Sequence, residues 1–331
     1  MLDRLLVEAI NKDVSDVHIT SDEFVYIRKS KKMIRLEVKT SSDDVLKIAS
    51  EILGDRYDSL FEERQLDGSK SINGVRVRYN FYFERDKLSV ALRIIKNEIR
   101  SIDDLMLPDV LKSLIKNHSG LILVTGPTGS GKSTTLAAMI NEINQTMSKH
   151  IVTVEDPIEY IFENDKSLIH QREIGVDTLE FSDALRAVLR QDPDVIMLGE
   201  LRDQETIETA LKASETGHLV LSTLHTSGAK STINRISGVF KGKDEERIRY
   251  LLSDSLLAVI SQRLIPLADK TGVVPAFEIL VNTNAISNLI KKGEVGQIDS
   301  YIKMNSKEGS ISFDDSINYL IKSRRIDPND L

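Results

Sequence analysis

The stretch Gly126-Pro127-Thr128-Gly129-Ser130-Gly131-Lys132-Ser133 decides the fold of this 331-residue chain. It follows the apolar run 121–124 and leads into the helix-prone segment 134–140, so the motif G-x-x-x-x-G-K-[ST] stands between a strand and a helix. Its glycines let successive backbone N–H groups point at an anion without a side chain in the way. The helix that follows directs the positive end of its dipole at the same anion. The sequence therefore predicts a loop that binds the phosphates of a nucleoside triphosphate.

Two side chains at the end of this loop have separate predicted roles. We expect the Lys132 ammonium to reach the β- and γ-phosphates, and the Ser133 hydroxyl to ligate Mg²⁺. An incidental glycine-rich turn does not explain why strand, spacing, lysine and serine occur together.

Composition limits the class of protein. The chain is 40% hydrophobic and 29% charged, it has no apolar run near the ~20 residues that span a bilayer, and its start lacks the apolar core of a signal peptide. It has no cysteine, which excludes disulfides and thiolate metal sites. The formal net charge of −7 argues against a general nucleic-acid-binding surface. A chain of this length favours two domains.

Residues 1–97 are predicted to form a first, α+β domain. Within 75–83, apolar residues alternate with Arg76, Arg78, Asn80 and Tyr82, so one face of the strand is buried and the other is basic. The segment 88–92 repeats the pattern and is followed by Arg93, which indicates a neighbouring antiparallel strand. The arginines either keep an exposed sheet face soluble or meet a phosphate.

A polar linker over residues 98–118, with a short helix at 109–115, is predicted to lead to a second domain at 119–331. Strand and helix alternate there, which is typical of a mostly parallel, doubly wound sheet. The predicted strands are 121–125, 151–154, 195–198 and 219–222. Their continuous apolar character fits strands that are buried on both faces.

Ligands of such sheets gather at the carboxyl ends of the strands. Glu155 and Asp156 follow the second predicted strand, Glu200 and Arg202 follow the third, and His225 follows the fourth. Glu200 stands where a Walker B acid belongs, without the usual preceding aspartate, and a carboxylate there would orient the attacking water. Each acid alone could be a helix cap, and His225 alone could be a core histidine, but their occurrence at successive strand ends favours a catalytic site.

With these motifs in place, the chain resembles the secretion ATPases of the type II/type IV pilus superfamily, above all the PilT-type pilus retraction motors. The resemblance runs nearly end to end and is carried by the phosphate loop 126–133, an acidic box at 153–159, a Walker B segment at 194–203, a histidine box at 222–227, and the segments 15–18, 170–175 and 258–264. It differs in two places. Ser287 stands where the motif at 285–290 has arginine in the family, and only Arg28 remains of an N-terminal Gly-x-Pro-Pro-x-x-Arg motif.

The resemblance implies an α/β fold in which a smaller α+β, PAS-like N-terminal domain precedes a RecA-like P-loop NTPase domain. It implies a homo-hexameric ring that hydrolyses ATP with Mg²⁺ at the cytoplasmic face of the inner membrane, where it works with the membrane platform protein of a pilus machine. By the same resemblance, Glu159 and Glu200 are the catalytic carboxylates, and Arg76, Arg78 and Arg93 approach nucleotide from the N-terminal domain or across a subunit boundary. The residues expected to bind or process ATP and Mg²⁺ are Gly126, Pro127, Thr128, Gly129, Ser130, Gly131, Lys132, Ser133, Thr134, Glu155, Asp156, Glu159, Glu200, Arg202 and His225.

Several alternatives stay open at this point. A pilus assembly or type II secretion ATPase shares these motifs, although many assembly motors carry a longer N-terminal extension and a four-cysteine zinc insert. A ring subunit that binds nucleotide without hydrolysing it would not need Lys132, Ser133, Glu159 and Glu200 intact. A DNA translocase would need aromatic and basic residues interleaved, and an ABC-type ATPase would need a Leu-Ser-Gly-Gly segment, which the chain lacks.

Overall fold

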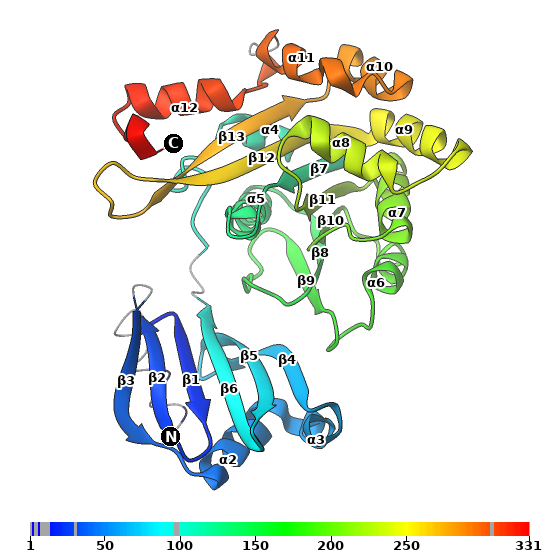
Figure 1. Ribbon diagram of the computed structural model, residues 1–331. Coiled ribbons are helices and arrows are strands. Elements are labelled where there is room, and N and C mark those ends of the chain that lie inside the picture. Colours follow the sequence, from blue (N-terminus) through cyan, green and yellow to red (C-terminus); the bar gives the residue numbers. More distant parts are fainter. Residues whose placement is uncertain are drawn as a thin grey trace. The chain divides into compact units, whose positions relative to one another are not determined.

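The computed structural model describes residues 2, 6, 14–29, 32–95, 99–304 and 308–330. The chain divides into two compact units, one of Met1–Glu98 with Pro157–Ile161, the other of Ile99–Asp156 with Phe162–Leu331. The boundary predicted between residues 97 and 98 lies outside the described residues, and the domain limits stay a prediction. Figure 1 shows the helices and strands of both units.

The first unit is built on an antiparallel sheet of six strands in the order β3-β2-β1-β6-β5-β4. The strands are β1 (Asp16–Thr20), β2 (Phe24–Lys29), β3 (Lys32–Lys39), β4 (Gln65–Ile72), β5 (Val75–Glu84) and β6 (Lys87–Ile95). The helices α2 (Ser42–Leu53) and α3 (Ser59–Glu63) lie between β3 and β4 in the chain, separated by a 3₁₀ turn at Gly54–Arg56. The alternation at 75–83 is confirmed, since Val77, Tyr79 and Phe81 of β5 are buried while Arg78 is exposed.

The helix α2 begins and ends for local reasons. The Ser41 hydroxyl accepts a hydrogen bond from the backbone N–H of Asp44, whose carboxylate accepts in turn from the Ser41 N–H, which forms a capping box. At the other end Gly54 has a φ of 56°, a conformation that glycine adopts at little cost. The Lys70 ammonium also donates to the last carbonyls of the helix, those of Glu51 and Ile52. Between these two ends, the buried side chains of α2 pack in one core cluster with those of the sheet.

The second unit is built on a seven-stranded sheet in the order β13-β12-β7-β11-β10-β8-β9, parallel except for β13. The strands are β7 (Gly120–Thr125), β8 (His150–Glu155), β9 (Leu168–Glu173), β10 (Val195–Leu198), β11 (Leu219–Leu224), β12 (Leu256–Pro266) and β13 (Val273–Val281). All four predicted strands are present, and β9, β12 and β13 were not predicted.

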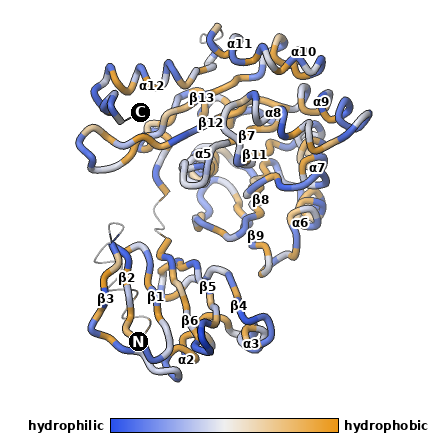
Figure 2. The backbone as a smooth tube through the Cα atoms, in the orientation of Figure 1, coloured by the Kyte–Doolittle hydropathy of each residue, from blue (hydrophilic) through white to orange (hydrophobic). Residues whose placement is uncertain are grey.

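Helices cover both faces of this sheet, as a doubly wound fold requires. Consecutive strand residues point to opposite faces, so Leu121 and Leu123 of β7 pack in one core cluster with side chains of α6 to α11, and Ile122 and Val124 pack in another with α4 and α5. The helices are α4 (Val110–Leu114), α5 (Lys132–Thr146), α6 (Phe181–Val188), α7 (Gln204–Glu215), α8 (Ala229–Gly238), α9 (Lys243–Ser255), α10 (Asn284–Lys292), α11 (Ile298–Met304) and α12 (Phe313–Lys322), with 3₁₀ turns at Val295–Gln297 and Pro328–Asp330. Hydrophobic and hydrophilic residues alternate along helices such as α6 and α7 (Figure 2).

Residues 99–118, predicted as a polar linker, contribute buried side chains to the second unit. Ile102, Leu111 and Ile115 belong to the same core cluster as Ile122 of β7, and the predicted short helix is present as α4. In the part of the chain that the structure describes, no helix combines the length and hydropathy needed to cross a membrane.

An ion-pair cluster between α7 and α9 gives a test of this packing. The Glu208 carboxylate lies 3.0 Å from Arg247 and 2.7 Å from Lys212, and hydrogen bonds from these two side chains lower the pKa of Glu208 to about 2, from an ordinary value of 4.5. Because the folded-state pKa is lowered, the stabilisation is present above pH 4.5 and is lost as the pH falls towards 2.

We expect Glu208→Gln to lower the free energy of unfolding by about 0.5–1 kcal/mol at pH 7, a small effect because water screens these partly exposed charges. The difference from the wild type should shrink as the pH is lowered, which urea unfolding at a series of pH values measures. A difference that stays constant down to pH 2 would contradict the ion-pair origin.

Candidate functional site

The phosphate loop connects β7 to α5, as the sequence predicts, and its backbone requires glycine. Gly126, Gly129 and Gly131 have φ values of 146°, 78° and 88°, a region that side chains other than glycine rarely adopt. A Cβ atom on Gly126 would also lie 2.3 Å from the backbone oxygen of Gln262. The conformation of the loop is therefore set by residue type before any ligand is bound.

Lys132 is folded back over this loop. Its side chain is buried, and its ammonium donates to the backbone oxygens of Gly126 at 3.0 Å and Pro127 at 3.1 Å. Nδ1 of His225 lies 3.4 Å from the same ammonium. Because an ammonium is only a donor, Nδ1 must be the acceptor, which assigns the proton of a neutral imidazole to Nε2.

The Nε2 atom of His225 lies 3.6 Å from one carboxylate oxygen of Glu200. The other oxygen of Glu200 accepts a hydrogen bond from Nε of Arg202 at 2.5 Å, and Arg202 also forms an ion pair with Asp156 at 3.2 Å. The hydrogen bond from Arg202 to Glu200 raises the pKa of the guanidinium. Residues that follow β8, β10 and β11 thus form one chain of contacts, which runs from Asp156 through Arg202, Glu200 and His225 to Lys132. Arg202 contacts the two carboxylates of this chain, those of Glu200 and Asp156.

The remaining residues of the predicted set are placed differently. Glu155 is buried and accepts hydrogen bonds from Thr153 at 2.6 Å and from Gln171 at 3.2 Å, so its carboxylate is tied to β8 and β9. Ser133 is exposed in the first turn of α5, next to the half-buried Thr134. These positions leave the Ser133 hydroxyl accessible.

The residues around the loop fit a nucleoside triphosphate with a divalent cation. The buried hydroxyls of Ser130 and Thr125 have no hydrogen-bond partner among the described residues, and such groups are normally satisfied. The Lys132 ammonium is held by two neutral carbonyls, and a phosphate oxygen is a stronger acceptor for it. Mg²⁺ would be held by Ser133 and Glu200.

Four predicted catalytic residues belong to the other unit. Glu159 is exposed in the segment Pro157–Ile161, which groups with the N-terminal unit, and Arg76, Arg78 and Arg93 lie on β5 and β6. Because the phosphate loop lies in a different unit, the catalytic roles of these four residues stay predictions.

The arginines nevertheless share one face of their sheet. Arg78 and Arg93 are direct cross-strand partners, Arg76 donates to the hydroxyl of Ser69, and Arg93 donates to Asp16 at 2.9 Å. Burial alone would raise the pKa of Asp16, but hydrogen bonds from Arg93 and Ser15 outweigh it, and the net shift is downward.

Comparison with known proteins identifies the family. Residues 1–289 match the family described as "Type II/IV secretion system protein". A "Twitching motility protein" of Neisseria gonorrhoeae is 42% identical over 290 residues, 87% of this chain and 78% of the relative. The "Type IV pilus retractation ATPase PilT" of Pseudomonas aeruginosa is 41% identical over 94% of this chain and 91% of its own length. The chain belongs to the type II/IV secretion system protein family.

A solved structure agrees. The crystal structure of the pilus retraction motor PilT with bound ADP is 42% identical, has a TM-score of 0.86, and is matched over 99% of this chain and 98% of that one. The resemblance stated from the motifs is thus confirmed, as is the predicted fold class, a RecA-like P-loop domain preceded by a smaller α+β domain. The chain is an ATPase of this secretion family and binds nucleotide.

Sequence reasoning missed three residues that support the site. Gln262 of β12 bonds to the phosphate loop, while Ser261 and Glu278 accept hydrogen bonds at the start of α8, just after the histidine box of this secretion ATPase. Two consecutive buried polar residues in the apolar run 256–262 are the signal that could have found the first two.

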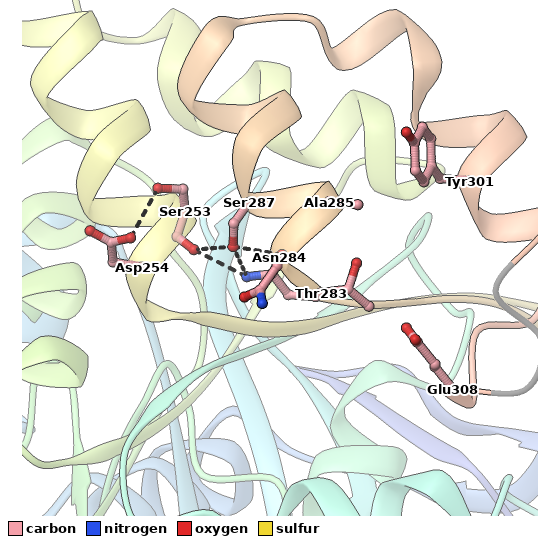
Figure 3. A pocket seen from close by; sticks show the side chains of 9 residues that line it. Ser253, Asp254, Thr283, Asn284, Ala285, Ser287, Tyr301 and Glu308 are labelled. Atoms are coloured by element: carbon pink, nitrogen blue, oxygen red, sulfur yellow. Dashed lines mark hydrogen bonds between the residues drawn. The ribbon is translucent and has the colours of Figure 1, made fainter.

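The family motif at 285–290 adjoins a separate pocket of about 640 Å³ (Figure 3). The Ser287 hydroxyl donates to the backbone oxygen of Ser253 at 2.8 Å and accepts from the amide of Asn282 at 3.1 Å. The pocket is lined by Ser253, Asp254, Asn282, Thr283, Asn284, Ala285, Ser287, Tyr301 and Glu308, none of which belongs to the phosphate loop. The serine that departs from the family motif is thus bonded within the second unit.

The Lys132 ammonium gives the most direct test of the site. We expect Lys132→Ala to weaken ATP binding and to lower kcat by roughly 10²–10³-fold, because the phosphates lose a buried cation. Binding of a fluorescent nucleotide and phosphate release measure the two effects. Lys116→Ala, a change at an exposed lysine of the same unit, is the control. Unchanged turnover in Lys132→Ala would remove Lys132 from the mechanism.

Proposed function

We propose that this chain is an ATP-hydrolysing motor that powers retraction of type IV pili. The observation that carries the proposal is the chain of contacts Lys132–His225–Glu200 beside the phosphate loop, in a protein 41% identical to a pilus retraction ATPase over 94% of its length. The function predicted from the motifs, ATP hydrolysis coupled to mechanical work, requires this combination of a phosphate-binding cation and a carboxylate that acts on water.

Each residue of the site has one task in this proposal. Lys132 leaves the carbonyls of Gly126 and Pro127 to bind the β- and γ-phosphates, and Glu200 orients the attacking water and accepts its proton. His225, neutral and protonated on Nε2, lies between them and reports the departure of Lys132 to Glu200. Mg²⁺, when bound, neutralises charge on the phosphates. Glu159 is the second proposed catalytic carboxylate.

The arginines of the first unit have a proposed role in closure. Arg78 and Arg93 lie directly opposite one another, and like charges in this position destabilise a sheet, so an anion supplied from outside the unit would relieve their repulsion. We assign Arg76, Arg78 and Arg93 to the γ-phosphate charge of a nucleotide reached by domain closure or across a subunit boundary. Rigid-body movement of the first unit would then couple hydrolysis to force.

The assembly that suits this mechanism is a homo-hexameric ring. The proposed partners are the inner-membrane platform protein and the other components of a pilus machine, at its cytoplasmic face. No nucleic-acid partner is proposed, given the net charge of −7.

One observation favours a second function. Ser287 replaces the arginine of the family motif tied to retraction, and the "Type II secretion system protein E" of Aeromonas hydrophila is 39% identical over 80% of this chain, although over only 54% of its own length. A motor that drives assembly or secretion is therefore the alternative.

Glu200→Gln separates binding from chemistry. The amide keeps the size of the side chain but cannot accept a proton, so we expect ATP to bind within about 3-fold of wild type while kcat falls by roughly 10²–10⁴-fold. Glu215→Gln, at an exposed glutamate of the same unit, should leave both unchanged. Loss of ATP binding in Glu200→Gln would make Glu200 chiefly a metal ligand.

Arg78→Gln tests the contribution of the first unit. We expect a kcat at least about 10-fold lower, towards the ~10³-fold range of an arginine that stabilises phosphoryl transfer, with an unchanged oligomer in size-exclusion chromatography. Arg85→Gln, on the exposed turn of the same sheet, is the matched control. A monomeric or aggregated Arg78→Gln protein would indicate a packing role.

A gene deletion in the source organism tests the direction of force. Abundant surface pili without surface motility, restored by the wild-type gene and not by Glu200→Gln, would establish a retraction motor. A bald surface would establish the assembly alternative.

A further inference from the structure

Strand β12 places two buried polar side chains side by side in the chain, at Ser261 and Gln262. They are only 1% and 2% exposed, and consecutive residues of a strand point to opposite faces of the sheet. A buried polar group that is not satisfied costs stability, so the partners of these two residues show what each one supports. Both sets of partners lie beside the ATP site, in two different loops.

Gln262 holds the phosphate loop. Its amide nitrogen donates to the backbone oxygen of Ser130 at 2.6 Å, and its amide oxygen accepts from the hydroxyl of Thr135, in the first turn of α5, at 2.9 Å. A Cβ atom on Gly131 would lie 3.1 Å from the same amide nitrogen. One side chain therefore connects the loop to the helix that begins at Lys132 and also touches the loop glycine.

Ser261 and Glu278 hold the segment that follows His225. They are cross-strand partners on β12 and β13. The backbone N–H of Gly228 donates to the Ser261 hydroxyl at 2.8 Å, and the N–H of Ala229 donates to the Glu278 carboxylate at 2.8 Å. Burial raises the pKa of Glu278, and the hydrogen bond from Ala229 opposes that shift. These two bonds satisfy N–H groups at the start of α8, which helices leave without intrahelical partners.

We propose that Ser261, Gln262 and Glu278 form a bracket that fixes the distance between Lys132 and His225. Gln262 positions the phosphate loop. The Ser261–Glu278 pair positions the segment 225–229, the histidine loop. The hairpin β12–β13 therefore holds both loops in fixed positions relative to one another. The three are positioning residues, which act through the side chains that contact nucleotide. The inference rests on the proposed ATP hydrolysis. It adds that neighbouring residues of one hairpin have separate roles, Gln262 in nucleotide binding and the Ser261–Glu278 pair in the chemical step.

Substitutions in the two parts of the bracket are therefore predicted to affect different quantities, nucleotide affinity for Gln262 and kcat for Glu278. Gln262→Met keeps the volume of the side chain but removes both polar contacts, and we expect nucleotide binding to weaken about 10-fold with kcat changed less than about 3-fold. Glu278→Ala leaves the Ala229 N–H without its partner and frees the histidine loop, and we expect kcat to fall about 10-fold with binding changed less than about 2-fold. Titration with a fluorescent ADP analogue and steady-state ATPase assays on the full chain give both quantities.

Conservative variants separate positioning from general stability. In Glu278→Gln the amide oxygen still accepts from Ala229, so kcat should return to within about 2-fold of wild type. Ser261→Ala should lower kcat with little effect on binding. Its control is Ser214→Ala, which makes the same change at a serine that is 2% exposed and bonds only within α7. If Gln262→Met lowers the folded fraction, Thr135→Val removes one of its two bonds and must weaken binding in the same direction.

Three outcomes would overturn the bracket. These are a Glu278→Gln protein as slow as Glu278→Ala, equal effects of Gln262→Met and Glu278→Ala on both parameters, and an effect of Ser214→Ala equal to that of Ser261→Ala. A wild-type protein that does not hydrolyse ATP would instead contradict the proposed function. The two failures are therefore distinguishable in one set of assays.

Discussion

The buried ammonium of Lys132 is the interaction on which the rest of the site depends. A buried charge is costly unless it is paired or hydrogen-bonded, and the contacts of this ammonium include the backbone oxygens of Gly126 and Pro127 and one imidazole nitrogen of His225. A phosphate oxygen is a stronger acceptor than any of these three neutral groups. Nucleotide binding can therefore proceed as an exchange of partners, with the fold of the loop already fixed.

The same principle extends to the carboxylates. Glu200 is held by the guanidinium of Arg202, which also pairs with Asp156, so the charge of the carboxylate that we propose acts on water is compensated. Arg202 is half exposed, and water screens such pairs enough for them to separate at small cost. His225 joins this cluster to Lys132, so a change of partner at the lysine reaches the carboxylate through one neutral ring.

The sequence predicts the centre of the second unit well, and the reason is burial. The strands that became β7, β8, β10 and β11 are continuous apolar runs because both of their faces are covered. β9 was missed because it is an edge strand of mixed composition, with Leu168 and His170 exposed. The segment 99–118 was predicted as a polar linker, yet Ile102, Leu111 and Ile115 are buried in the core of the second unit.

The sequence predicts that Glu200 and His225 lie near one another because the carboxyl ends of parallel strands meet at one edge of the sheet. This prediction needs only the order of the strands along the chain. The contacts of Gln262 could not be predicted, because its bond to Ser130 joins residues 132 positions apart in the chain, and the local pattern in 256–262 indicates a buried polar residue without indicating its partner. That Arg202 binds the cofactor stays a prediction, and in the structure its guanidinium contacts Glu200, Asp156 and the ring of Phe181. The roles of Glu159 and the three arginines depend on domain placement, and a single sequence carries no signal of that geometry.

The charge balance of the first unit is the observation behind the role proposed for its arginines. On the polar face of its sheet, Asp16 lies beside both Arg93 and Arg28, so one carboxylate serves two guanidiniums, and Arg78 stands opposite Arg93. Burial lowers the pKa of the neighbouring His18. The guanidiniums of Arg28, Arg78 and Arg93 therefore occupy neighbouring cross-strand positions on this face, with the Asp16 carboxylate between two of them. Such a face is suited to an anion that arrives and leaves, and a nucleotide whose γ-phosphate is consumed in each cycle is an anion of this kind.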